Sequence, residues 1–147
     1  MVNKKVRNAA THVYDGITFR SMLEQRIYQV LKEEGFETEY EVEKITLLES
    51  FKPKQVWYID GKKQVMKSGK ESLTVREKTY TPDFRFTLAG GTTVYLEAKG
   101  HPNDAYPVTR KMFLWWIDQQ LKPILFVEIH SVKGLRDFIN VLREEIM

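Results

Sequence analysis

The sequence predicts an α/β fold with a mixed sheet (an α+β arrangement) and helices packed on it, in the element order α-β-β-β-α-β-α. Helical and alternating hydrophobic patterns follow one another in that order along the chain. A helix between the last two strands implies a crossover, which joins parallel strands. The 147 residues, 42% of them hydrophobic, are enough for one domain with its own core. We therefore expect a single domain over residues 1–147, with a basic N-terminal arm at 1–12 and an inserted hairpin and loop at 49–78.

The first predicted elements are a short strand pair and a helix. The strand pair runs from Val13 to Phe19 around a turn at Asp15–Gly16. Ser21 is a residue type that caps helices, and the apolar side chains after it follow the helical period as far as Gly35. Residues 37–43 then alternate glutamate with less polar side chains, which predicts a half-exposed strand.

Two hairpins come next. The first spans Gln55–Val65 with Asp60–Gly61 as a two-residue turn, and the polar stretch 66–77 after it predicts a loop. The second has alternating strands at 84–88 and 94–98, separated by a glycine pair.

The last part of the chain predicts helix, strand, helix. Bulky side chains fill a helix over Val108–Leu121, which ends before Pro123. The continuously apolar run Ile124–Ile129 is typical of a strand buried on both faces. Ser131 then caps the final helix.

Composition excludes several classes of protein. The absence of cysteine rules out a disulfide scaffold, a thiolate zinc site and thiol catalysis. The chain shows no secretory signal, and its apolar runs fall far short of the ~20 residues of a membrane span. We therefore expect a cytoplasmic protein with no membrane partner. The net charge is +3, and the basic side chains gather in the N-terminal arm and in residues 52–78, where they either meet a polyanion or form a solvated surface.

The second hairpin carries the residues of greatest chemical interest. If its loop is the three residues 89–91, Asp83 lies directly opposite Glu97, whereas a two-residue loop would place Asp83 on the other face. Lys99 shares a face with Glu97 because alternate residues of a strand point the same way. Two opposed carboxylates favour a divalent cation between them, and a nearby lysine can act on water or phosphate. The alternative is a surface hairpin with ordinary solvated charges.

Glu24 is a third candidate carboxylate. It is the acidic residue in the first two turns of the first helix, at the edge of the apolar stripe. A glutamate there either interacts with the positive end of the helix dipole or is presented toward the sheet.

Three strings together resemble a known family: Phe19–Glu24, Tyr80–Phe84 and Leu96–Gly100. The chain is similar over about Phe19 to Ile129 to the PD-(D/E)XK nucleases, and among them to the small phage enzymes of the endonuclease I and Holliday junction resolvase type. The resemblance implies a restriction-endonuclease-like core with an active site that hydrolyses DNA phosphodiesters. It also implies that the protein acts in a bacterial or phage-infected host cell. By motif, its catalytic residues are Glu24, Asp83, Glu97 and Lys99.

The same resemblance implies a cofactor and partners. The expected cofactor is Mg²⁺, with Mn²⁺ able to substitute, held by Asp83, Glu97, the Ala98 carbonyl and Glu24. The expected substrate is branched DNA such as a Holliday junction, and a homodimer would supply the two active sites that symmetric cutting needs. The segment from Leu48 to Thr79 is longer than in the phage enzymes. A restriction-like or transposase-associated duplex endonuclease, and a non-catalytic DNA-binding or assembly module, therefore remain alternatives.

Further DNA contacts are expected from basic side chains near these motifs and at the turn of the first hairpin. The alternative for each is a solvated side chain, and the first hairpin is an arm for DNA, an arm for a second subunit, or a plain extension of the sheet. The candidate DNA contacts are Arg20, Lys62, Lys63, His101, Arg110 and Lys111.

Overall fold

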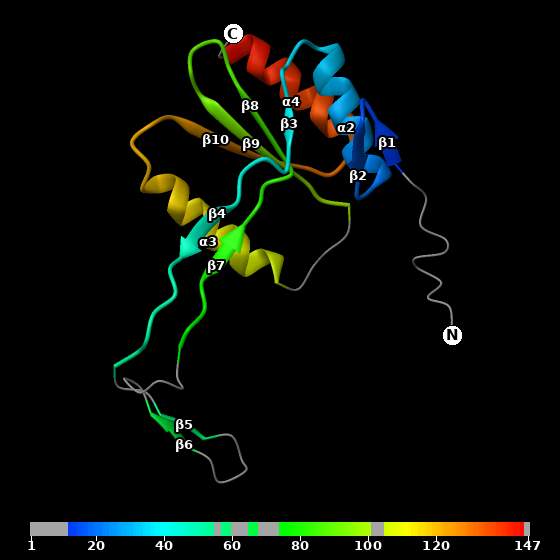
Figure 1. Cartoon of the computed structure of the whole chain (residues 1–147). Coiled ribbons are helices and arrows are strands. Elements are labelled where there is room, and N and C mark those ends of the chain that lie inside the picture. Colours follow the sequence, from blue (N-terminus) through cyan, green and yellow to red (C-terminus); the bar gives the residue numbers. More distant parts are fainter. Residues whose placement is uncertain (1–11, 55–56, 60–64, 68–73, 101–104, 146–147) are drawn as a thin grey trace, which may run out of the picture.

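The computed structural model describes residues 12–54, 57–59, 65–67, 74–100 and 105–145, and it shows a mixed α/β fold (Figure 1). The helices of these residues are α2 (Met22–Glu33), α3 (Tyr106–Asp118) and α4 (Val132–Glu145). The central sheet has the strand order β10 (Ile124–Ile129), β9 (Thr93–Ala98), β8 (Phe84–Thr87) and β3 (Glu39–Tyr40). β10 pairs parallel with β9, and the other pairs are antiparallel. The predicted mixed sheet and its parallel crossover are therefore confirmed.

Helices cover both faces of this sheet. α2 and α4 pack on one face, where Ile27, Leu31 and Leu135 are fully buried against Val94 and Leu96 of β9. The residue between those two, Tyr95, points to the other face and packs against Phe113 of α3. β9 thus alternates between two hydrophobic cores, as a strand inside a three-layer arrangement must.

Three short strand pairs lie outside the central sheet. β1 (His12–Tyr14) pairs with β2 (Ile17–Phe19), and the turn between them has a positive φ at both Asp15 and Gly16, as a tight hairpin turn requires. β4 (Ile45–Leu48) pairs with β7 (Lys78–Tyr80) beside α3. β5 (Trp57–Ile59) and β6 (Val65–Lys67) lie at the far end of the extension that β4 and β7 begin (Figure 1).

The helix ends agree with the predicted caps. The Ser21 hydroxyl accepts a hydrogen bond from the backbone N–H of Glu24 at 3.1 Å, and Ser131 does the same for Gly134 at 3.0 Å. Gly35 follows α2 with φ at +89°, a conformation in which glycine costs little. α3 starts at Tyr106 rather than Val108, because Pro107 fits the first turn of a helix.

The second hairpin has the three-residue loop that the site prediction needs. The N–H of Leu88 donates to the carbonyl of Thr92 at 2.9 Å, and Phe84 pairs with Leu96. One step beyond that pair, Asp83 lies across from Glu97. The predicted register is confirmed.

Other strand predictions are corrected by the structure. Of residues 37–43, Glu39–Tyr40 form a strand, because Glu41 adopts φ of +47° and the chain leaves the sheet there. In the first hairpin Ile59 pairs with Val65, and the expected turn at Asp60–Gly61 lies outside the described residues.

Two further expectations depended on long-range pairing. Met66 and Lys67 belong to β6, and Val75 forms a bridge with Phe51, so the stretch 66–77 is not simply a loop. β10 is an edge strand whose residues before Ile129 are half-buried, rather than a strand buried on both faces. Among the described helices, none is long and apolar enough to cross a membrane.

Candidate metal centre

Acidic side chains from four different elements meet at one end of the central sheet. Glu24 lies in the first turn of α2, Glu41 follows β3, Asp83 precedes β8 and Glu97 belongs to β9. Glu24, Asp83 and Glu97 are only 7%, 9% and 8% exposed. Carboxylates are rarely buried to this degree unless they are paired or bound.

Asp83 and Glu97 form the centre of this group. Burial, and then the charge of Glu97, raises the pKa of Asp83 to about 8, although a hydrogen bond from the Ala98 N–H to Asp83 Oδ2 at 2.8 Å opposes the shift. Burial also raises the pKa of Glu97, against hydrogen bonds from Tyr80 and Asp83 and the charge of Lys99. Without a cation, the pair therefore retains a proton near neutral pH that a divalent ion would displace.

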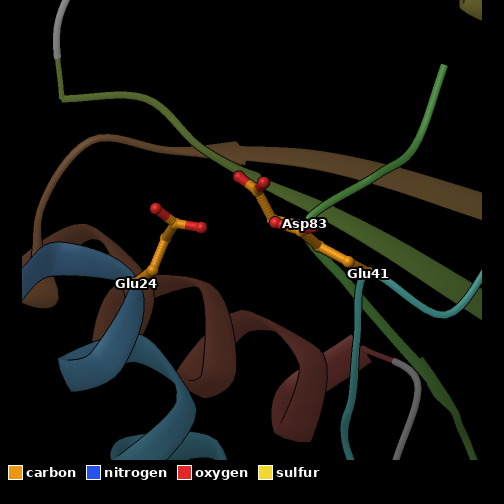
Figure 2. Close-up of side chains that lie close together, drawn as sticks. All are labelled: Glu24, Glu41 and Asp83. Carbon is orange, nitrogen blue, oxygen red and sulfur yellow. The ribbon is translucent and has the colours of Figure 1, made fainter. Parts of the chain in front are cut away.

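Glu41 joins Asp83 from the other side. Glu24, Glu41 and Asp83 each offer a carboxylate oxygen, and these oxygens lie within 4.8 Å of one another (Figure 2). The positive φ at Glu41 re-aims its side chain, and its N–H donates to the Asp83 carbonyl at 2.8 Å. A non-glycine residue in this conformation is uncommon and is often found at functional sites.

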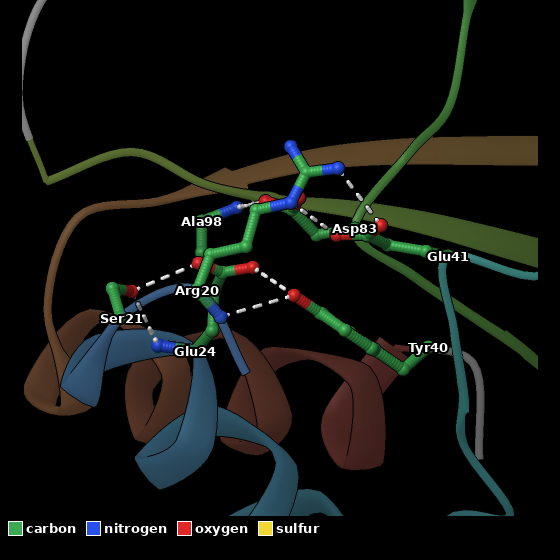
Figure 3. A network of polar contacts seen from close by, with 7 residues as sticks. All are labelled: Arg20, Ser21, Glu24, Tyr40, Glu41, Asp83 and Ala98. Atoms are coloured by element: carbon green, nitrogen blue, oxygen red, sulfur yellow. Dashed lines mark hydrogen bonds and ion pairs between the residues drawn. The ribbon is translucent and has the colours of Figure 1, made fainter. Parts of the chain in front are cut away.

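Hydrogen bonds hold these carboxylates in place, as Figure 3 shows. Ser21 Oγ donates to Glu24 Oε2 at 2.9 Å, and the Tyr40 hydroxyl donates to Glu24 Oε1 at 2.8 Å. Arg20 lies over the group and contacts both oxygens of Glu41, with Nε 2.9 Å from Oε1 and Nη2 3.0 Å from Oε2. Both sequence alternatives for Glu24 hold, since it bonds to its own helix cap and also faces the cluster.

Glu97 has hydrogen-bonding and charged neighbours that differ from those of Glu24 and Glu41. The Tyr80 hydroxyl donates to Glu97, and burial together with the charge of Glu97 raises the pKa of Tyr80, so the hydroxyl stays a donor. The Lys99 ammonium lies 3.9 Å from the centre of the Tyr106 ring. Lys99 thus sits beside the acids but is supported by an aromatic face.

Two clefts open onto this group, and Lys99 lines both. One, of ≈ 400 Å³, is bordered by Asp83 and Glu97 together with the cationic side chains of Arg20 and Lys78. The other, of ≈ 420 Å³, is bordered by Glu24 and by the segment 98–100. The arrangement is an acidic centre inside a cationic rim.

The donor set fits a divalent cation. Its candidate ligands are all carboxylate oxygens, which hard ions such as Mg²⁺ and Mn²⁺ prefer, and burial, followed by the neighbouring charge of Glu97, raises the pKa of Asp83. Ala98 lies in the site, and its N–H orients Asp83. Ligation by the Ala98 carbonyl stays a prediction.

The predicted DNA contacts are distributed over different places. Arg20 lines the cleft of the acids, while Arg110 is engaged with Glu128, its Nε lying 3.3 Å from Oε1. Lys111 lines a separate, mostly apolar pocket beside Leu48 and Trp115. Lys62, Lys63 and His101 lie outside the described residues.

Sequence reasoning missed Glu41, Tyr80, Tyr106 and Glu128. Glu41 was expected on the exposed face of a strand, and no residue pattern signals its positive φ. Tyr80 stands directly before the Thr81–Pro82–Asp83 string, which is the one local signal that could have indicated it.

Comparisons with known proteins place the chain in a family. No curated protein and no solved structure matches it. A family model described as a protein of unknown function, DUF1064, matches residues 4–133, which is most of the chain. The chain therefore belongs to the DUF1064 family.

Proposed function

We propose that this protein is a metal-dependent DNA endonuclease that hydrolyses phosphodiester bonds, uses Mg²⁺ or Mn²⁺, and acts on branched DNA. The observation that carries the proposal is the opposition of Asp83 and Glu97 across the β8–β9 hairpin, with Lys99 lining the same cleft. This is the arrangement that the Pro–Asp and Glu–x–Lys strings would have in a PD-(D/E)XK nuclease.

The order of the elements supports the same assignment. The central sheet and its helices follow the sequence α2, β3, β8, β9, α3, β10, α4, which is the order expected for a restriction-endonuclease-like core. β4 to β7 are then an insertion between the first and second core strands. Helices cover both faces of the sheet, and two clefts open at the end of the sheet where the acids meet.

In this function the acidic residues hold the ion and the lysine acts on the phosphate. When bound, the divalent ion supplies Lewis-acid activation of water and neutralises phosphate charge. Asp83, once deprotonated with its proton released to solvent, would hold the ion together with Glu97, and the Ala98 N–H and the Tyr80 hydroxyl keep these two carboxylates oriented. Lys99 donates to a non-bridging phosphate oxygen or to the attacking water, where charge grows in the transition state.

The cationic rim would bind the backbone of the substrate. Arg20 and Lys78 border the cleft of the acids and can contact phosphates without reading sequence. Selectivity for branched DNA, and a homodimer that places two sites on one junction, follow from the resemblance and form part of the proposal.

The test is a cleavage assay with matched variants. Purified protein should nick supercoiled plasmid with Mg²⁺ and not with EDTA, and it should cut a four-way junction faster than a linear duplex of the same sequence. Asp83→Ala should remove cleavage, while Asp137→Ala, which removes an exposed carboxylate paired with Lys133, should not. DNA binding without cleavage under Mg²⁺ and Mn²⁺ would overturn the nuclease in favour of a binding module. Equal cutting of junction and duplex would overturn only the substrate.

A further inference from the structure

A third carboxylate continues the row of Asp83 and Glu97 across the sheet. Glu128 of β10 pairs with Glu97 in the parallel ladder, so the two side chains leave the sheet on the same face. Asp83 just before β8, Glu97 of β9 and Glu128 of β10 therefore lie at the same level of the sheet.

Glu128 is nevertheless surrounded by donors. Its Oε1 accepts from the Tyr106 hydroxyl at 2.6 Å and lies 3.3 Å from Arg110 Nε, and its Oε2 lies 3.2 Å from His130 Nε2. Burial alone would raise the pKa of Glu128, but the Tyr106 hydrogen bond and the charge of Arg110 outweigh it and the pKa is lowered. This carboxylate already has its partners within the protein.

Tyr106 connects Glu128 to Lys99. The hydroxyl end of the ring is held by Glu128, and the Lys99 Nζ lies 3.9 Å from the ring centre. The backbone of Lys99 is fixed as well, because its N–H donates to the Ile129 carbonyl at 2.8 Å and its carbonyl lies 2.9 Å from His130 Nδ1. The Tyr106 ring thus contacts the Lys99 ammonium, while Ile129 and His130 hold the Lys99 backbone.

We propose that Tyr106 and Glu128 are positioning residues, which hold the Lys99 ammonium at the acidic cleft through the face of the Tyr106 ring. A lysine side chain is a flexible four-carbon stem that samples many rotamers in solution. An aromatic face attracts the ammonium without neutralising it, so the charge stays available to the phosphate. A carboxylate in direct contact would instead have paired with it. The proposal rests on the nuclease function for its catalytic consequence, but not for the placement of Lys99.

The kinetic test measures single-turnover cleavage by variants made in the wild-type protein and in Lys99→Ala protein. Tyr106→Leu should lower the rate ~10–100-fold, the range for outer-shell partners. Tyr106→Phe and Glu128→Gln should lower it less, because Tyr106→Phe keeps the ring and Glu128→Gln keeps an acceptor oxygen. In Lys99→Ala protein, none of the three should cause a further loss. Junction affinity, measured with Ca²⁺, should stay unchanged.

A matched control separates this role from a general need for tyrosine hydrogen bonds. Tyr95 points to the same face of β9 as Glu97. Its hydroxyl donates to Glu43 at 2.8 Å, away from Lys99. Tyr95→Phe should leave the rate unchanged. An equal loss in Tyr95→Phe and Tyr106→Phe, or an undiminished effect of Tyr106→Leu in Lys99→Ala protein, would overturn the proposal.

A second measurement does not depend on cleavage. In the proton NMR spectrum the Lys99 ε-methylene should be shifted upfield by the ring in the wild type and in Tyr106→Phe, and should move to its ordinary position in Tyr106→Leu. If the wild type cuts no DNA while this shift is present, the nuclease function fails and the placement of Lys99 stands. An unshifted methylene in the wild type overturns the positioning role, whatever the activity.

Discussion

Glu97 and Glu128 are the same residue type, paired on adjacent parallel strands, yet their electrostatic surroundings are opposite. Burial raises the pKa of Glu97, which faces Asp83 and Glu24. The pKa of Glu128 is lowered, because Tyr106 and Arg110 outweigh its burial. The position of a carboxylate in a sheet therefore does not decide whether it can hold a cation. What decides it is whether the surrounding side chains already supply donors and positive charge.

The largest expected effect is at Asp83 and Glu97, where the surrounding side chains supply less positive charge than at Glu128. Asp83→Ala and Glu97→Ala should abolish cleavage, because each would remove an oxygen ligand of the proposed ion. DNA affinity should be unchanged or higher, since repulsion between carboxylates and phosphates falls. Glu128→Gln should retain measurable cleavage. Plasmid nicking with Mg²⁺ and a gel-shift titration measure both quantities, and loss of all activity in Glu128→Gln would remove the distinction between Glu97 and Glu128.

The next largest effect is expected at Lys99, which lies close to both Glu97 and Tyr106. Lys99→Ala should lower single-turnover cleavage by about 10²–10³-fold, as when one transition-state donor is removed, with folding, metal affinity and junction binding nearly unchanged. Lys99→Arg should restore part of the rate if only charge matters, and little if proton transfer matters, since arginine cannot release a proton at neutral pH. Cleavage by Lys99→Ala at the wild-type rate would make Lys99 a surface charge.

Metal affinity should depend on pH through Asp83. With its pKa raised to about 8, the ion must displace a proton, so Mg²⁺ affinity should rise ~tenfold per pH unit up to that value and then level off. Calorimetric titrations in buffers of different ionisation enthalpy should show about one proton released per ion at pH 7. Glu128→Gln should keep this dependence, whereas Asp83→Asn should lose it. A pH-independent affinity in the wild type would contradict the raised pKa.

The last effect is on the stability of the metal-free protein. The folded pKa of Asp83 is raised from 3.8 to about 8, so its contribution to stability is complete below pH 3.8 and is lost as pH rises toward 8. Between these values the free energy of unfolding should fall by at most about 1.4 kcal/mol per pH unit for this group. Denaturant unfolding in EDTA at pH 5 and pH 8 measures the difference, which should shrink in Asp83→Asn. Glu128 has the opposite sign, since its lowered pKa makes its contribution disappear only in acid.

Several features of the site could be predicted because they depend on residues close together in the chain. The three-residue loop and the alternation of its strands determine the register that opposes Asp83 to Glu97. The same alternation places Lys99 on the face of Glu97, and Ser21 determines where α2 begins. Local turn chemistry and side-chain periodicity contain this information.

Features that depend on distant pairing could not be predicted. β4 and β7 find each other across about thirty residues, and their pairing follows from the core that α3 forms on that side of the sheet. β10 reads as a fully buried strand because its composition is apolar, but it lies at an edge, with a strand neighbour on one side only. Composition reports how apolar a strand is, whereas burial depends on what packs against it.

The chain by itself determined the mixed α/β class from its hydrophobic patterns, and the hairpin register with the meeting of Asp83, Glu97 and Lys99 from spacing over a few residues. The tertiary structure decided that Glu41 turns toward Asp83 through a positive φ, and that Tyr106 joins Glu128 to Lys99. The physical reason is that a carboxylate's charge state and a lysine's position depend on groups brought close in space by packing. Glu41 after β3 and Glu128 on β10 lie far from the hairpin in sequence, and no local pattern encodes their approach or the contact of Tyr106 with Lys99.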